Sequence, residues 1–211
     1  APSGATVYVT HGLPLPDSVT GPGTPVDVYV NGDRALDDFT FGQTAGPLTL
    51  PAGNYKVEIR TPDGITTLIT KEVAVPGAGN FSLVASFVDA AGTPGINVFQ
   101  NDVSRAWKGL GRVGLHHAAA APAVDIAAGL SFLPKLPKLT LVKGAVNGNA
   151  ATFTLPTFLS YGVDVRLAGT KTTVLSVPKA TVSNKVLTNV YVVGSAAGGT
   201  LQPLVVTIPV G

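Results

Sequence analysis

The chain has 211 residues, enough for one large or two small domains. Hydrophobic residues make up 45% of it and charged residues 12%, a balance that excludes an intrinsically disordered chain, and the lack of cysteine excludes disulfides, thiolate metal sites and cysteine nucleophiles. The formal net charge of +2 conceals an asymmetry, because residues 1–108 sum to −4 (six Lys/Arg, ten Asp/Glu) and the remainder to +6 (eight Lys/Arg, two Asp/Glu).

The chain begins with the small residues of "APSGA" and contains no methionine. This start is typical of what signal-peptide cleavage leaves, so we expect a secreted protein at the cell surface. A start trimmed during preparation is the alternative. No apolar run reaches the ~18 residues that a membrane helix needs, so no membrane span is expected.

Period-two alternation marks the predicted strands of the first half. Residues 5–11 form an apolar run, and residues 24–30 alternate and lead into Asn31-Gly32, a hairpin signal. Residues 54–60 alternate apolar with charged side chains. Gly and Pro separate such segments at intervals of roughly 8–15 residues, which is typical of an antiparallel sandwich of about seven strands.

The second half repeats the first in four blocks that keep their order, with a period of about 105 residues. The blocks pair 5–12 with 111–118, 24–30 with 122–128, 48–60 with 153–166 and 80–98 with 187–206. Such a period is too long for a solenoid and has the size of a domain. We therefore predict an all-β fold of two tandem immunoglobulin-like antiparallel β-sandwich domains, residues 1–107 and 108–211, joined by a short linker at 103–112.

Each repeat also contains a candidate tyrosine corner, in which a Tyr hydroxyl bonds to upstream backbone and locks a crossing between sheets. Tyr55 in "LPAGNY" fits this pattern. Tyr161 is its equivalent, although one inserted residue in "LPTFLSY" makes the second copy less regular.

The repeated motifs place a histidine, then a Pro-Val-Asp segment, then a Leu-Pro-Ala-Gly-Tyr segment in each half. They are His11, Pro25–Val28 and Leu48–Val57, and again His117, Pro122–Ile126 and Phe153–Val163, where the Ala-Gly pair is lost. The pattern resembles bacterial secreted proteins that carry the domain of unknown function 4397. The resemblance covers nearly the whole chain and implies paired immunoglobulin-like sandwiches outside a bacterial cell. It brings no catalytic residues.

The histidines are the candidates for chemistry. His116 and His117 are strand neighbours that leave opposite faces, so they do not readily bind one ion together. The repeat places His117 opposite His11, which defines the pairs His11–Asp27 and His117–Asp125. The members of the pair are sixteen positions apart in one copy and eight in the other, and a pair that recurs around different loops favours a structural role: a buried or half-buried hydrogen bond between two strands. Metal or acid–base chemistry is the alternative, but zinc needs three or four ligands, so we predict no metal, cofactor or catalytic residue.

Two further features allow a binding role. Asp33, Asp37 and Asp38 lack the alternating spacing of a calcium loop, so we expect a solvated turn, with weak calcium binding as the alternative. The only tryptophan, Trp107, is expected to pack between the domains, with a sugar-stacking platform as the alternative. The lysines of the second half are scattered without interleaved aromatic residues, so no nucleic-acid partner is expected.

The segment after each Val-Asp strand carries opposite charge in the two halves. Three aspartates follow in the first half, and Lys135, Lys138 and Lys143 follow in the second. Opposite charge on equivalent surfaces favours a head-to-tail contact, which forms rings or filaments, and apolar terminal strands can extend a neighbour's sheet. We therefore predict a secreted, non-enzymatic structural or adhesion protein that self-associates. Binding of a cell-surface glycan or another polymer is the alternative.

Overall fold

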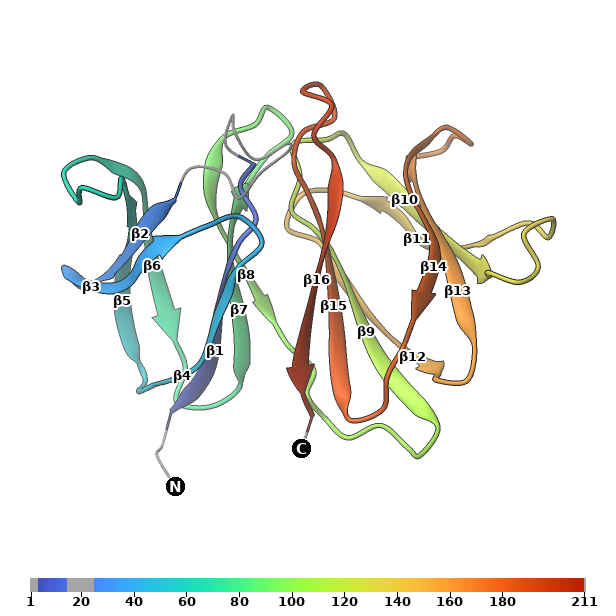
Figure 1. Ribbon diagram of the computed structural model, residues 1–211, viewed down its shortest axis with the longest axis horizontal. Coiled ribbons are helices and arrows are strands. Elements are labelled where there is room, and N and C mark those ends of the chain that lie inside the picture. The colour runs from blue at the N-terminus through green and yellow to red at the C-terminus, as the bar shows by residue number, and fades with distance from the viewer. Residues whose placement is uncertain (1–3, 15–24, 211) are drawn as a thin grey trace. The chain divides into compact units, whose positions relative to one another are not determined.

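The computed structural model describes residues 4–14 and 25–210. They form sixteen strands in four four-stranded sheets (Figure 1). None of them belongs to a helix long and apolar enough to cross a membrane. The chain divides into two compact units, one comprising residues up to Val88 with Thr93–Asn101, the other Asp89–Gly92 with the residues from Asp102 onward.

The first unit is a sandwich of two sheets, with strand orders β4-β1-β7-β8 and β3-β2-β5-β6. Its strands are β1 (Ala5–His11), β2 (Val26–Val30), β3 (Asp33–Phe39), β4 (Thr44–Leu50), β5 (Gly53–Arg60), β6 (Thr67–Val75), β7 (Asn80–Phe87) and β8 (Pro94–Gln100). Both sheets contribute to one apolar core, which includes Val28, Ile59 and Leu83. This core forms because each strand turns alternate side chains toward the facing sheet.

The second unit repeats this topology strand for strand, with orders β12-β9-β15-β16 and β11-β10-β13-β14. Its strands are β9 (Leu110–His117), β10 (Val124–Leu130), β11 (Leu139–Ala145), β12 (Ala150–Pro156), β13 (Ser160–Leu167), β14 (Thr173–Thr181), β15 (Val186–Val193) and β16 (Gln202–Pro209). The all-β class and the pair of sandwiches are thereby confirmed. The core of the second unit is split into two apolar clusters.

Two details differ from the expected antiparallel sandwich of about seven strands. The described residues of each unit form eight strands, and each unit contains one parallel pair of strands, β1 with β7 in the first and β9 with β15 in the second. The other pairs are antiparallel. Alternation shows which side chains share a face but carries no information on the direction of the neighbouring strand, so the parallel pair is visible only in the fold.

The linker segment is fastened to the first strand of the second unit. The Arg112 guanidinium donates to Asp102 Oδ2 at 2.6 Å and to the Ser104 carbonyl at 3.1 Å. The Ser104 hydroxyl also donates to Asp102, and together with Arg112 it holds the pKa of that carboxyl below its usual range. These contacts explain why residues from Asp102 onward belong to the second unit, whereas the sequence indicated a boundary after residue 107.

Both predicted tyrosine corners are present. The Tyr55 hydroxyl donates to the Pro51 carbonyl at 3.0 Å, and the Tyr161 hydroxyl donates to the Pro156 carbonyl at 2.9 Å. The first bond is exposed and the second is partly buried. The residue inserted before Tyr161 therefore lengthens the corner without breaking it.

We expect Tyr161→Phe to lower the free energy of unfolding of the second unit by about 1 kcal/mol, because the Pro156 carbonyl loses its donor in a partly buried site. Guanidinium unfolding followed by circular dichroism measures this loss. Tyr55→Phe is the matched variant in the first unit, and its effect is expected to be smaller because water replaces the hydroxyl there. A Tyr161→Phe protein as stable as the parent would contradict the role of the second corner.

Candidate functional site

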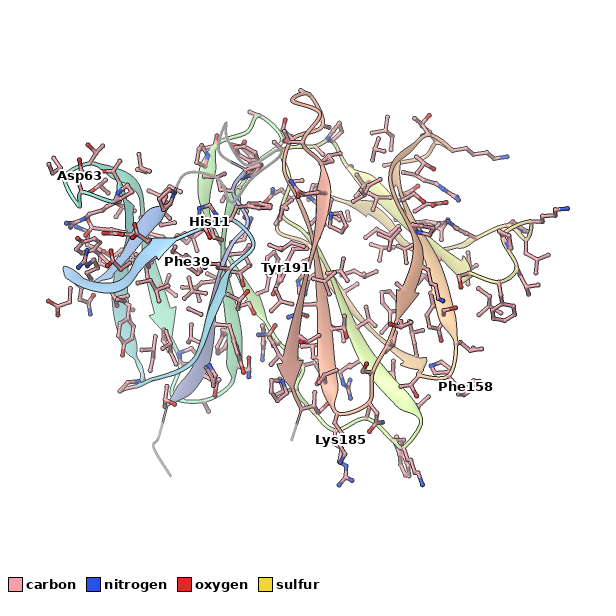
Figure 2. All side chains as sticks on the ribbon, viewed as in Figure 1. His11, Phe39, Asp63, Phe158, Lys185 and Tyr191 are labelled. Carbon is pink, nitrogen blue, oxygen red and sulfur yellow. The ribbon has the colours of Figure 1, made fainter. Side chains whose placement is uncertain are left out.

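His11 and His117 occupy equivalent positions at the ends of β1 and β9. Their amide groups donate to the carbonyls of Gln43 at 3.0 Å and Asn149 at 2.9 Å, respectively, so the same main-chain bond recurs in both units. The two side chains are buried. The repeat alignment and the burial of both histidines are therefore confirmed. In Figure 2 the His11 side chain lies beside Phe39, and their ring centroids are 5.9 Å apart.

The predicted hydrogen bonds between these histidines and the aspartates are wrong. Within the described residues neither ring nitrogen of His11 has a hydrogen-bond partner. Nε2 of His117 lies 3.4 Å from the carbonyl oxygen of Pro122 rather than near Asp125. Among the described residues of both units, the predicted histidine–aspartate hydrogen bond between the first and second strands is thus absent.

The pleat of β2 explains this outcome. Val26 and Val28 point into the core, so Asp27 between them points to the outer face of its sheet. His11 lies on a strand of the facing sheet and points inward. Asp125 is placed in the same way on β10. Histidine and aspartate of each repeat are therefore separated by a layer of apolar side chains.

Asp27 and Asp125 instead accept hydrogen bonds from the backbone of a bulge in the adjacent strand, β3 in the first unit and β11 in the second. Oδ1 of Asp27 accepts from the amide of Asp38 at 3.0 Å, and Oδ1 of Asp125 accepts from the amide of Gly144 at 2.7 Å. Asp38 and Gly144 both have positive φ, 49° and 59°. Asp125 also accepts from the Gly169 amide at 2.9 Å, and these backbone donors hold the pKa of Asp125 below its usual range. The aspartate of the Val-Asp motif is structural in both repeats.

An acidic cluster forms in the first unit, where the sequence indicated a solvated turn at Asp33, Asp37 and Asp38. Carboxylate oxygens of Asp27, Asp37 and Asp38 lie within 4.8 Å of one another, and Asp33 is not part of the group. Arg34 donates to Asp37 at 2.9 Å and to Asp27 at 3.4 Å. The guanidinium supplies the counter-charge that these carboxylates need. Weak calcium binding stays the untested alternative to a solvated turn, and Asp27 rather than Asp33 would belong to its ligand set.

The lysine-rich segment of the second unit is partly neutralised from within. Lys138 Nζ donates to Asp164 at 2.5 Å, and Arg166 donates to the same carboxylate at 3.2 Å. Lys135 and Lys143 take part in no ion pair in the described part of the chain. Because Arg34 and Lys138 both have carboxylate partners, the attraction between the two charged surfaces is smaller than the sequence indicates.

Trp107 is 85% exposed, and its expected packing between the two domains stays a prediction. Its carbonyl accepts from the Leu110 amide at 3.0 Å and from Asn184 Nδ2 at 3.2 Å. Gly109, in the same turn, has a φ of 82°, and its carbonyl accepts from the Thr157 amide at 2.9 Å. The loops that contain Asn184 and Thr157 thus hold the backbone of this turn in place, and the indole side chain of Trp107 extends from it into solvent.

A second aromatic side chain is exposed beside this turn. Phe158 follows Thr157 directly and is 81% exposed, and Lys108 and Lys185 are exposed on the same group of loops. Figure 2 shows Phe158 and Lys185 at the lower end of the second unit. We call Trp107, Lys108, Phe158 and Lys185 the aromatic end. The loss of the Ala-Gly pair in "TFLS" was the only sequence signal for Phe158.

Comparison with protein families identifies the fold's relatives. Residues 5–127, which are 123 of the 211, match the domain of unknown function DUF4397. The chain belongs to the DUF4397 family. The DUF4397 match spans the described strands of the first unit and continues through β9 into β10. No curated protein sequence matches the chain.

Two solved structures have similarities that cover nearly the whole DUF4397 chain. One is CBMbc, a family CBM26 module from Eubacterium rectale Amy13K in complex with maltoheptaose, at 10% identity and a TM-score of 0.28, covering 96% of this chain and 95% of that one. The other is the Bacillus anthracis TIE protein, at 11% identity and a TM-score of 0.21, covering 99% of this chain and 32% of that one. At such TM-scores neither structure informs the function of this chain.

Proposed function

We propose that this protein is a non-enzymatic binding module that acts outside the cell and holds an acidic polysaccharide at the aromatic end of its second unit. The observation that carries the proposal is Trp107, 85% exposed on a turn whose backbone is anchored by two neighbouring loops. Its extracellular location rests on the resemblance to secreted bacterial proteins.

The chemistry of the aromatic end suits a sugar polymer. Trp107 and Phe158 are large apolar rings held in water, and such exposed aromatic groups are typical of ligand-contact sites. The C–H face of a pyranose ring matches the flat face of an indole. Because hydrogen bonds hold the turn in place before any ligand arrives, little ordering of the backbone is needed on binding.

Charge favours an acidic polymer over a neutral one. Lys108 follows Trp107 directly, and Lys185 follows Asn184, whose side chain donates to the Trp107 carbonyl. Neither lysine takes part in an ion pair among the described residues. Two unpaired ammonium groups beside stacking surfaces match a carbohydrate that carries carboxylates. Attraction of this kind weakens with added salt.

The placement of the acid–base residues supports a non-enzymatic role. His11 and His117 are buried in the two sandwiches, and the Asp27 and Asp125 carboxylates accept hydrogen bonds from backbone amides. These groups stabilise the fold, and a histidine separated from its aspartate by apolar side chains does not form a proton-transfer pair.

Trp107→Ala is expected to weaken binding to an acidic polysaccharide such as alginate by roughly tenfold or more, since a central exposed Trp commonly carries much of a binding energy. Affinity electrophoresis against alginate, pectate and neutral dextran measures this. Phe132→Ala removes an aromatic side chain that is 58% exposed elsewhere on the second unit and serves as the matched control. Binding that is absent from the whole panel, or that survives Trp107→Ala, would remove the proposal.

Self-association is a second candidate function, favoured by the connection between β10 and β11. This connection and the first residue of β11 expose four large apolar side chains, and exposed apolar groups gathered on one segment are typical of protein contacts. They are Phe132 (58%), Leu133 (41%), Leu136 (61%) and Leu139 (71%). Light scattering after size exclusion, at low and high salt, tests it. A strict monomer at high concentration in both conditions would exclude a filament.

A further inference from the structure

The second unit contains an apolar cavity between its two sheets. Its volume is about 270 Å³, and it is lined by side chains from every strand of the unit, including Leu115, Phe153, Val163 and Val190. In the first unit the void in the centre of the sandwich, beside Leu83, measures about 10 Å³. A further apolar pocket of the first unit, of about 170 Å³, lies beside His11 and Pro94. The centre of the sandwich is therefore filled in the first unit and open in the second.

Smaller residues at three equivalent positions account for the cavity. The strand registers pair Val7 with Phe81 in the first unit and Val113 with Thr188 in the second, so Phe81 and Thr188 are equivalent positions. Counting along the paired strands from these two residues gives the other equivalent positions. The first unit has Phe81, Val73 and Ile96 where the second has Thr188, Ala180 and Pro203. The three larger side chains pack in or against the first core, whereas the three smaller ones line the cavity.

The cavity reaches solvent between the two edge strands β14 and β16. Its exposed lining residues are Lys179 and Thr181 on β14 and Val205 on β16, the last 57% exposed. In the first unit the corresponding edge strands, β6 and β8, pack against each other, and β14 and β16 make no contact of that extent. The sandwich is thus closed along this edge in one unit and open in the other.

Polar groups lie at the mouth of the cavity rather than in its interior. The Tyr161 hydroxyl is bound to the Pro156 carbonyl, and most of the other lining groups deeper in the sandwich are aliphatic or aromatic. Lys179 takes part in no ion pair in the part of the chain that the structure describes. An apolar interior with one ammonium group at its entrance matches a molecule that has an apolar chain and one anionic end.

We infer that this cavity binds the hydrocarbon chain of an anionic amphiphile, with its carboxylate at the Lys179 ammonium. An apolar cavity of roughly 150 Å³ holds a benzene molecule, so the larger space here accepts a medium-length chain. The site lies inside the second sandwich and is separate from the aromatic end, so it extends the protein's binding capacity to a second class of ligand.

Titration calorimetry of the full chain with decanoate and with decanol tests this inference. Decanoate is expected to bind the parent protein, and Thr188→Phe, which introduces the residue of the first unit, is expected to reduce that affinity at least tenfold. Thr154→Phe makes the same change at an exposed position on the opposite face of β12 from the lining residue Phe153 and should leave binding unchanged. Lys179→Gln should weaken decanoate severalfold and leave decanol unaffected.

Circular dichroism confirms that each variant is folded, and Ala180→Leu narrows the same cavity if Thr188→Phe does not fold. A parent protein that binds neither decanoate nor decanol, or folded filling variants that keep full affinity, would overturn the inference. Equal decanoate affinity in Lys179→Gln would overturn the placement of the carboxylate.

Discussion

Asp27→Ala is expected to lower the free energy of unfolding of the first unit by about 3 kcal/mol, because a fully buried carboxylate is removed from two donors. Asp27 accepts from the Asp38 amide at 3.0 Å and from Arg34 at 3.4 Å. Without it, the amide of a residue with positive φ loses its partner, and the bulge in β3 loses its fastening. The effect is measurable as a shifted midpoint in guanidinium unfolding.

Asp33→Ala supplies the control for this variant. Asp33 lies on the same strand, is exposed and belongs to no ion pair in the described part of the chain, so its loss should change the free energy by less than about 0.5 kcal/mol. Asp27→Asn keeps one acceptor oxygen and is expected to fall between the two. If the Asp27→Ala and Asp33→Ala proteins are equally stable, the aspartate of the Val-Asp motif does not stabilise the bulge in β3.

Acidification from pH 6.5 to 4 is expected to destabilise the protein through its buried histidines. Burial lowers the pKa of His11 to about 4, against an ordinary value of about 6.5. Between these values the unfolded chain binds a proton at His11 and the folded chain does not, so stability falls as pH falls. The free energy of unfolding lost through His11 sums to roughly 3 kcal/mol near pH 4, and protonation of His11 causes little further loss below that pH.

His11→Leu isolates this contribution, because leucine fills a similar volume beside Phe39 and does not titrate. The variant should lose stability less steeply than the parent between pH 6.5 and 4.5 in unfolding measured by calorimetry. Burial also lowers the pKa of His116 to about 4, so a reduced slope is expected to remain. Asp125 and Asp164, whose pKa values lie below their usual range, add their loss only below about pH 4. Parallel profiles for parent and variant would contradict the prediction.

The two units show how one topology diverges after duplication. Strand order, tyrosine corners and the aspartate fastening recur in both. Smaller side chains at Thr188, Ala180 and Pro203 leave the centre of the second sandwich open, whereas the centre of the first is filled, and the aromatic end also belongs to the second unit. Both binding proposals therefore fall on the second unit, while the first has the more completely packed core.

Local pattern was sufficient for much of this fold. Alternation of apolar and polar residues located the strands, and the Asn31-Gly32 pair, with φ of 52° and 90°, forms the two-residue hairpin between β2 and β3. The repeat predicted both tyrosine corners, since each depends on a hydroxyl and a carbonyl four or five residues apart. Such features need only neighbours in sequence.

The candidate sites depended on neighbours that are distant in sequence. Alternation shows that Asp27 leaves one face of its strand, but only the tertiary structure shows that His11 reaches the core from the facing sheet. A lone tryptophan is commonly buried, yet Trp107 is exposed on a turn whose backbone Asn184 and Thr157 anchor. The sequence alone determined the strands, the duplication and the family. Only the packing of sheet against sheet decided which polar groups meet, which rings face solvent and where the core stays open, because these depend on distances between residues that no local spacing encodes.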